Sequence, residues 1–299
     1  MERAEDRQTR SRFPPGIRYM AGAAFLFSLM SLFVKVAGRR LPTSELVLAR
    51  GVVIVAITLV MLRRAGTSPW GRRRRLLLLR GLLGFAAVGC FYYALSHIPL
   101  ADATVIQYTN PVWTALLAAA FLDERLRPVE VVGIASSLAG VVLVTRPSFL
   151  FGSEAAHLDP VVAGIALAGA VLSASAYVSV RKLNETEEPL VIVFYFALVS
   201  TLGAAPIAAT RALWPTPGEW LALAGVGITA QLAQLLMTHG LRRERAGRAM
   251  AVGYLQIVFA AAWGAIFFSE IPGVWTFAGA GLVVAGTWAA GRRAGAEAA

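Results

Sequence analysis

The sequence predicts an all-α integral membrane protein with ten transmembrane helices, arranged as two inverted five-helix repeats. Three observations support this prediction: the composition, the separation of charged from apolar segments, and an internal repeat. Hydrophobic residues make up 57% of the 299 residues, and charged residues make up only 15%. A globular domain has about 25% charged residues. The chain has too little polar surface to cover a water-exposed fold, so we expect a lipid bilayer around it.

The segments without charged side chains define the predicted helices. A helix needs about 20 mostly apolar residues to cross a bilayer. Lipid offers the backbone no hydrogen-bond partner, and the continuous apolar runs favour helices over the short alternating strands of a barrel. Nine of the segments lack Asp, Glu, Lys and Arg, and the second is interrupted only by Arg50. In chain order they are 19–34, 46–62, 81–101, 103–122, 131–145, 160–180, 189–210, 220–241, 249–269 and 271–291.

The positions of Lys and Arg predict the orientation, because cytoplasmic loops of membrane proteins are enriched in them. If the N-terminus is cytoplasmic, most of the 28 Lys and Arg residues fall on that side, Arg80 among them. We therefore expect a multi-pass protein of the bacterial inner (plasma) membrane with both termini cytoplasmic. A basic N-terminus before an apolar run also fits a cleaved signal peptide, but the nine later segments favour a polar tail, residues 1–16.

An internal repeat relates the two halves of the chain. When the sequence is shifted by 146 residues, segment 98–146 aligns with 244–292 without gaps. The matched pairs include Tyr108/Tyr254, Glu124/Glu270, Gly133/Gly279 and Gly140/Gly286, and the same shift places Lys35 on Arg181. We therefore expect a first repeat at 17–146 and a second at 160–292. Because each half has five segments, the second must enter the membrane from the opposite side. Inverted repeats are common in secondary transporters, whose substrate sites lie near the midplane between the halves.

One stretch resembles a known family. Residues 94–144 read ALSHIPLADATVIQYTNPVWTALLAAAFLDERLRPVEVVGIASSLAGVVLV. A small-residue turn, Asn110-Pro111, Asp123-Glu124 and a glycine-spaced fifth segment make it similar to the EamA-type repeat of the drug/metabolite transporter superfamily. The second copy keeps Glu270 and the glycines but has Ile257 in place of Pro111.

Within that superfamily, the ten-helix arrangement is most similar to the YddG-type amino acid exporters. The resemblance implies a basket of ten helices. Segments one to four and six to nine would line a central cavity, and segments five and ten would support it from outside. It also implies export of amino acids, aromatic or of broad range, or of related metabolites, by alternating access.

Polar and aromatic residues at helical spacing are the candidate substrate-binding residues. Gln231, Gln234 and Thr238 share one helix face, and an amide facing lipid without a partner is unfavourable by a few kcal/mol. They should face the cavity, or alternatively form hydrogen bonds between helices. Close helix packing is the alternative for the serines, and core packing for the tyrosines. The candidates are Phe27, Ser28, Ser31, Tyr92, Gln107, Tyr108, Asn110, Ser173, Tyr177, Gln231, Gln234, Thr238, Tyr254 and Gln256.

Four residues are candidates for gating or coupling. Pro111 should bend the fourth segment, as a hinge or as a static kink. His97 and His239 are candidates because histidine is the side-chain type used most often as a proton switch, although we favour a role in loop capping or at the interface. Arg50 lies one turn into the second segment. Its side chain could extend to the outer interface, which we favour, or attract a substrate carboxylate.

Several function classes are disfavoured. The net charge of +11 would suit a nucleic-acid partner, but the Arg residues lie between apolar runs rather than on one face. The sequence has neither a P-loop nor the spacing of a catalytic triad or zinc site, and its single Cys90 has no cysteine partner. We expect no enzymatic activity, catalytic residue, metal or cofactor. The expected partners are a small-molecule substrate and the bilayer, in a monomer or weak dimer. Uptake or efflux of another metabolite or drug is the alternative, and an integral-membrane enzyme is disfavoured.

Overall fold

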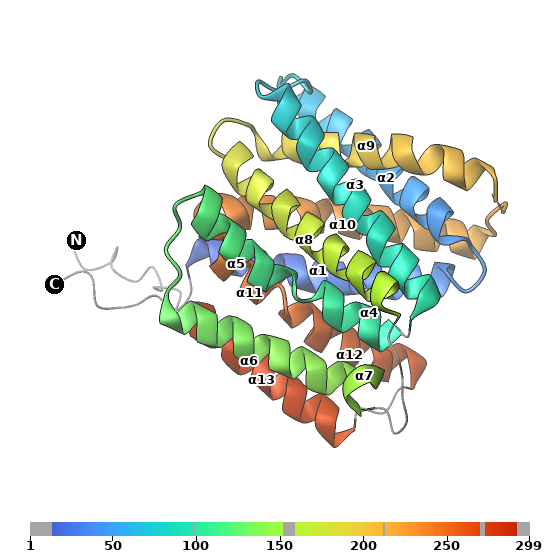
Figure 1. Ribbon diagram of the computed structural model, residues 1–299. Coiled ribbons are helices and arrows are strands. Elements are labelled where there is room, and N and C mark those ends of the chain that lie inside the picture. The colour runs from blue at the N-terminus through green and yellow to red at the C-terminus, as the bar shows by residue number, and fades with distance from the viewer. Residues whose placement is uncertain (1–13, 99, 152–158, 212, 270–272, 292–299) are drawn as a thin grey trace, which may run out of the picture.

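The computed structural model describes all residues except 1–13, 99, 152–158, 212, 270–272 and 292–299. Every regular element among the described residues is a helix, and the predicted fold class is confirmed (Figure 1). The helices are α1 (Pro15–Ala37), α2 (Thr43–Arg64), α3 (Arg74–His97), α4 (Leu100–Gln107), α5 (Asn110–Phe121), α6 (Pro128–Thr145), α7 (Ser148–Phe151), α8 (Pro160–Leu183), α9 (Pro189–Ala209), α10 (Pro217–Arg243), α11 (Ala246–Val252), α12 (Leu255–Phe268) and α13 (Val274–Gly291).

Eight helical segments in the described part of the chain are long and apolar enough to cross a membrane, and Val274–Ala290 is a shorter apolar helix. The fourth predicted segment is divided between α4 and α5. Six helices begin with a proline in their first turn. Proline suits this position because its missing N–H would have no partner within the helix. The first helix starts at Pro15, two residues before the end of the predicted polar tail.

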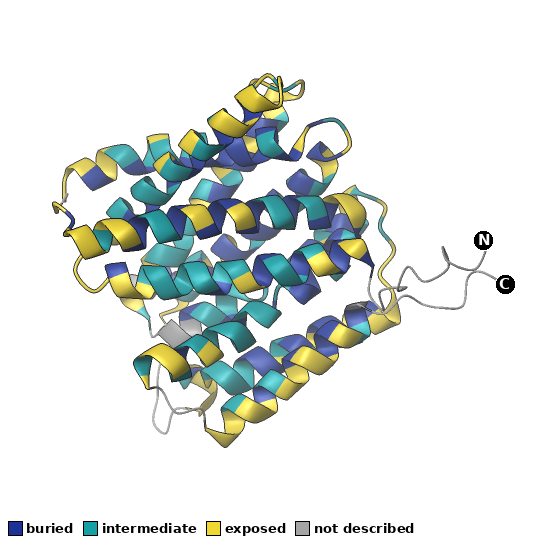
Figure 2. Cartoon of the chain, turned by 180° about the vertical axis from the view of Figure 1, so that it is seen from behind, coloured by how far each residue is buried: buried dark blue, intermediate teal, exposed yellow. Residues whose placement is uncertain are grey.

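Exposed side chains face outward on a mostly apolar surface. Figure 2 shows exposed residues along the outer faces of the helices and buried residues where helices meet. Large apolar side chains such as Leu221, Phe277 and Val132 are 76%, 69% and 63% exposed. An apolar surface of this extent fits a protein that lipid surrounds.

The two halves run in opposite directions. α6 packs along α13, and α2 packs along α9, although each pair occupies equivalent places in the two repeats. Both pairs are antiparallel. Gly133 meets Gly286 whereas Gly140 meets Gly279, and Glu45 accepts from the Leu213 N–H whereas Gly51 lies against Thr201. The other main contacts, α1 with α10 and α3 with α8, exchange with each other under the repeat. This arrangement is an inverted repeat, with α6 and α13 on the outside of the bundle (Figure 1).

Some residues contact their own repeat mates. The Tyr254 hydroxyl donates to the Tyr108 carbonyl at 2.9 Å, and the Ser137 hydroxyl donates to the Val283 carbonyl at 3.4 Å. Both pairs are 146 residues apart, the shift that the sequence predicts. A residue can meet its own mate only close to the two-fold axis that relates the halves. The axis therefore passes near the middle of the broken helices and between α6 and α13.

The fourth and ninth segments are each broken near the middle. The first break, at Tyr108 and Thr109, precedes Pro111, whose ring prevents a continuous helix. The second break, at Gly253 and Tyr254, has no proline after it. The predicted bend at Pro111 is therefore present, but proline explains only one of two equivalent breaks. The hydrogen bond from Tyr254 to the Tyr108 carbonyl pairs an acceptor that the first break leaves without a helical partner.

Candidate functional site

Two adjoining cavities lie between the halves. The larger has a volume of about 660 Å³ and the smaller about 180 Å³. They share lining residues Phe27, Met30, Phe91, Gln107, Tyr177 and Gln256. Predicted segments one to four and six to nine all contribute to the smaller cavity, as the family resemblance implies. Segment five also contributes, because Val144 and Thr145 of α6 line the larger cavity.

The broken helices bring polar groups into the middle of the bundle. The Gln107 side-chain amide donates to the Ser173 hydroxyl of α8 at 3.0 Å. The Gln107 Oε1 and Asn110 Oδ1 atoms are buried without a hydrogen-bond partner in the described part of the structure. The rings of Tyr108 and Tyr254 stack with centroids 6.0 Å apart. Because a buried polar group without a partner is unfavourable, these free acceptors mark places where a ligand can bind.

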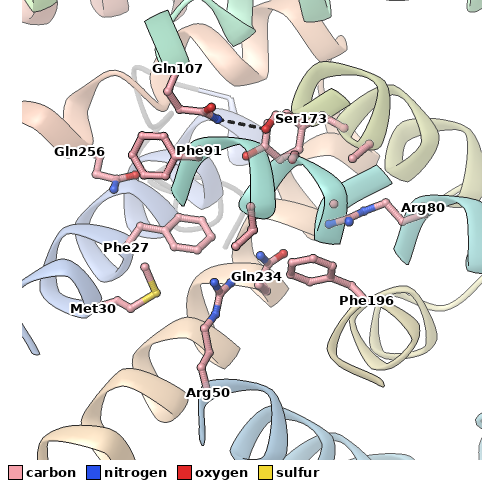
Figure 3. Close-up of a pocket in the computed structure, with 15 residues that line it drawn as sticks. Phe27, Met30, Arg50, Arg80, Phe91, Gln107, Ser173, Phe196, Gln234 and Gln256 are labelled. Carbon is pink, nitrogen blue, oxygen red and sulfur yellow. Dashed lines mark hydrogen bonds between the residues drawn. The ribbon is translucent and has the colours of Figure 1, made fainter. Parts of the chain in front are cut away.

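Two arginines line the smaller cavity (Figure 3). Arg50 comes from α2 and Arg80 from α3, and their guanidinium carbons lie 5.7 and 4.4 Å from the centre of the Phe196 ring. Arg80 is only 3% exposed, and its Nε and Nη1 atoms are buried without a hydrogen-bond partner. No Asp or Glu appears among the described residues that line either cavity. A cation–π contact offsets part of the desolvation of a guanidinium, but a buried charge without a counter-ion stays unfavourable by several kcal/mol.

The arginines correct two predictions. Arg50 lines the smaller cavity rather than reaching the outer interface, and Arg80 is buried in the bundle rather than in a cytoplasmic connector. The reason is helix length: α2 begins at Thr43 and α3 at Arg74, so both arginines lie well inside their helices. The sequence does indicate that Arg80 lies within a membrane segment, because four leucines precede it and two more follow within three residues.

The structure brings most of the predicted binding residues together. Ten of the candidates line one or both cavities: Phe27, Ser31, Gln107, Tyr108, Asn110, Ser173, Tyr177, Gln234, Tyr254 and Gln256. Pro111 lines the larger cavity as well. Sequence reasoning missed Phe91, Phe196 and the methionines, because an apolar residue in an apolar helix gives no signal of the face it occupies. The missed methionines of the larger cavity are Met20, Met30, Met237 and Met250.

Four predicted binding residues do not line these two cavities. The Ser28 hydroxyl accepts from Trp263 Nε1 at 3.0 Å, and Thr238 donates to the Gln234 carbonyl at 2.7 Å. Gln231 directs its amide toward the Met61 sulfur of α2 at 3.9 Å, a contact between helices.

Tyr92 is the fourth, and its neighbour Phe91 lines both cavities instead. A rotation of about 100° per residue moves adjacent side chains to different faces, so the cavity face of α3 differs from the predicted one.

The two histidines in the described part of the chain, His97 and His239, lie near helix ends and outside these cavities. The His97 ring stacks on Tyr93 with centroids 4.1 Å apart, and its Nδ1 lies 2.8 Å from the Tyr93 carbonyl. His239 lies against the Tyr19 ring at 5.7 Å and beside Arg243. These positions suit the interfacial role that the sequence favours.

The two halves are joined by polar contacts at one end of the bundle. We call this the terminal end, because α1 begins there and α13 ends there (Figure 1). Glu124 follows α5 in a turn where Asp123 has a φ of 54°. Its carboxylate accepts from Arg181 Nε of α8 at 3.0 Å and from the backbone N–H of Ala246 at 2.8 Å. These contacts join the two halves. Toward the opposite end, the larger cavity reaches Thr145, the last residue of α6.

Comparisons with known proteins agree with this architecture. The sequence model of the EamA-like transporter family matches residues 14–146 and 162–291. The pseudopaline exporter CntI of Pseudomonas aeruginosa is 33% identical over 270 residues, which cover 90% of this chain and 93% of that protein. Human solute carrier family 35 member G1 is 32% identical over 281 residues, with coverage of 90% and 77%. A solved crystal structure that is 22% identical superposes with a TM-score of 0.80 over 92% of this chain and 96% of its own. At that identity, the likeness shows the fold alone.

Proposed function

This chain belongs to the EamA-like transporter family of membrane transporters, and from that premise we propose that it exports amino acids or related small metabolites by alternating access. The observation that carries the proposal is the polar pocket between two inverted halves, at the breaks of the fourth and ninth segments. We further propose that it works in a bacterial inner membrane with its terminal end in the cytoplasm.

The arrangement of contacts supports this mechanism. In an alternating-access cycle, one end of the pathway is closed while the other is open. Here, Glu124 and Arg181 join the halves at the terminal end, whereas the larger cavity extends to Thr145 on the opposite side. In the proposed cycle, this arrangement corresponds to the outward-facing state. The breaks at Tyr108 and Tyr254 give each broken helix two segments that can move separately.

Gln107→Ala and Gln234→Ala test the proposal. Each removes an amide that lines a cavity. Loss of the hydrogen bond between that amide and the substrate should lower the initial rate of export about tenfold. The measurement is counterflow in proteoliposomes against a panel of amino acids, with and without a pH gradient. Gln231→Ala is the matched control, because it removes the same type of side chain outside the cavities, from the helix that also carries Gln234. If all three variants export at the wild-type rate, with melting temperatures unchanged, the amides do not take part in the pathway.

The same panel decides between substrates. Uptake or efflux of another metabolite or of a drug is the alternative, and it predicts counterflow of that compound without counterflow of any amino acid. We also propose that the protein has no enzymatic activity and acts as a monomer or weak dimer.

A further inference from the structure

The smaller cavity has a fixed positive charge. Arginine stays protonated in proteins, so Arg50 and Arg80 contribute two positive charges to one wall. The Phe196 ring lies next to both guanidinium groups. The distance between the two guanidinium carbons therefore cannot exceed the sum of their distances from the ring centre. The Nε and Nη1 atoms of Arg80 are buried without a hydrogen-bond partner within the described structure, and no Asp or Glu is among the described residues that line this cavity. Two like charges held this close repel each other, and a bound anion would relieve that repulsion.

The chemistry of these groups selects the ligand. A guanidinium presents a planar fork of N–H donors that matches the two oxygens of a carboxylate. One carboxylate would compensate one of the two charges, whereas two carboxylates would compensate both. The ammonium group of a simple amino acid would add a third positive charge near this wall. Among the described residues that line the two cavities, its partners would be neutral groups, such as the free Oε1 of Gln107.

The larger cavity suits the rest of such a molecule. Its wall carries Met20, Met30, Met237 and Met250 beside the stacked rings of Tyr108 and Tyr254. Methionine side chains are flexible and polarizable, and they adapt to apolar groups of different shape. The shared lining residues Phe27, Phe91 and Gln107 place the larger cavity directly beside the smaller cavity, which Arg50 and Arg80 line. One molecule can therefore occupy both cavities.

We propose that Arg50 and Arg80 form a subsite for two carboxylates of one substrate, whose apolar body lies in the methionine-lined chamber. The preferred class is then amino acid derivatives or other metabolites with at least two carboxylates, rather than simple zwitterionic amino acids. This proposal rests on the proposed transport function and names the substrate class of the same site.

Two probes that differ by one charge test the subsite. N-benzoyl-glutamate has two carboxylates and an aromatic body, and N-benzoyl-glutamine replaces one carboxylate by an amide. Binding to the purified protein is measured by thermal stabilisation, and transport by counterflow in proteoliposomes. We expect the Kd of the dicarboxylate to be lower by about ten- to a hundredfold, the usual effect of a charge-assisted hydrogen bond. Equal affinity of the two probes would overturn the proposal.

Variants of the arginines complete the test. Arg80→Gln should raise the Kd of N-benzoyl-glutamate about tenfold or more and change that of N-benzoyl-glutamine by less than about threefold. Arg80→Lys keeps the charge and should recover part of the preference. Arg50→Gln carries the same test at a partly buried position if Arg80→Gln does not fold. Arg211→Gln, an exposed arginine beyond α9, is the matched control.

The outcomes separate the two proposals. Selective binding of the dicarboxylate without counterflow of any compound would leave the subsite in place and remove the export function. Counterflow of amino acids would support the export function. If the two probes then bind with the same Kd, and the wild type and Arg80→Gln do not differ, the subsite is ruled out.

Discussion

Gly140→Ala should separate α6 from α13 and lower the free energy of unfolding by about 2–3 kcal/mol, within the range for an overpacked helix contact. A Cβ atom at Gly140 would lie 2.5 Å from the Gly279 carbonyl oxygen of α13. This neighbour is backbone and cannot rotate away, so the helices must move apart. Thermal unfolding of the purified protein in detergent measures the effect.

A second glycine provides the control. Gly281 also lies within α13, but a Cβ atom there would meet nothing within 4 Å. Gly281→Ala should leave the melting temperature unchanged or raise it slightly, because alanine favours a helix by about 0.5–1 kcal/mol over glycine. If Gly140→Ala and Gly281→Ala unfold at the same temperature, the close contact of α6 and α13 does not stabilise the fold.

Glu124→Gln should open the terminal end. Its carboxylate holds Arg181 and the N–H of Ala246, and the Glu124 side chain is only 12% exposed. The amide keeps the shape but removes the charge, which leaves Arg181 without its counter-ion. Loss of one charge-assisted hydrogen bond should raise the population of the open end about tenfold.

Chemical labelling measures this opening. Met20 lines the larger cavity and is 2% exposed, so a cysteine there reports access from the terminal end. In a Cys90→Ser background, Met20→Cys should react slowly with a membrane-impermeant maleimide applied at that end. Adding Glu124→Gln should raise the rate about tenfold. Glu185→Gln is the control, because the pair of Glu185 with Lys182 is about half exposed and such pairs contribute little. An unchanged rate in Glu124→Gln would show that other contacts close this end.

The sequence alone determined the number and order of the membrane segments. Lipid offers no partner for backbone groups, and long apolar runs suit helices rather than the short alternating strands of a barrel. The repeat was equally accessible, because a shift of 146 residues pairs Tyr108 with Tyr254 and Gly140 with Gly286. The structure confirms the inverted arrangement, and Tyr254 even donates to the carbonyl of its own mate.

The tertiary structure decided which side chains face the cavity. Helical periodicity shows that Gln231 and Gln234 share a face, but Gln231 contacts Met61 whereas Gln234 lines the cavity. The sequence also predicts a bend at Pro111. It does not predict the equivalent break at Tyr254, which no proline causes. In a membrane bundle, lipid, neighbouring helices and cavity walls all accept apolar residues, so the pattern along one helix cannot distinguish them. The pair of arginines was hidden for the same reason. Arg50 and Arg80 come from different helices, and only the packing of the bundle brings both next to the Phe196 ring.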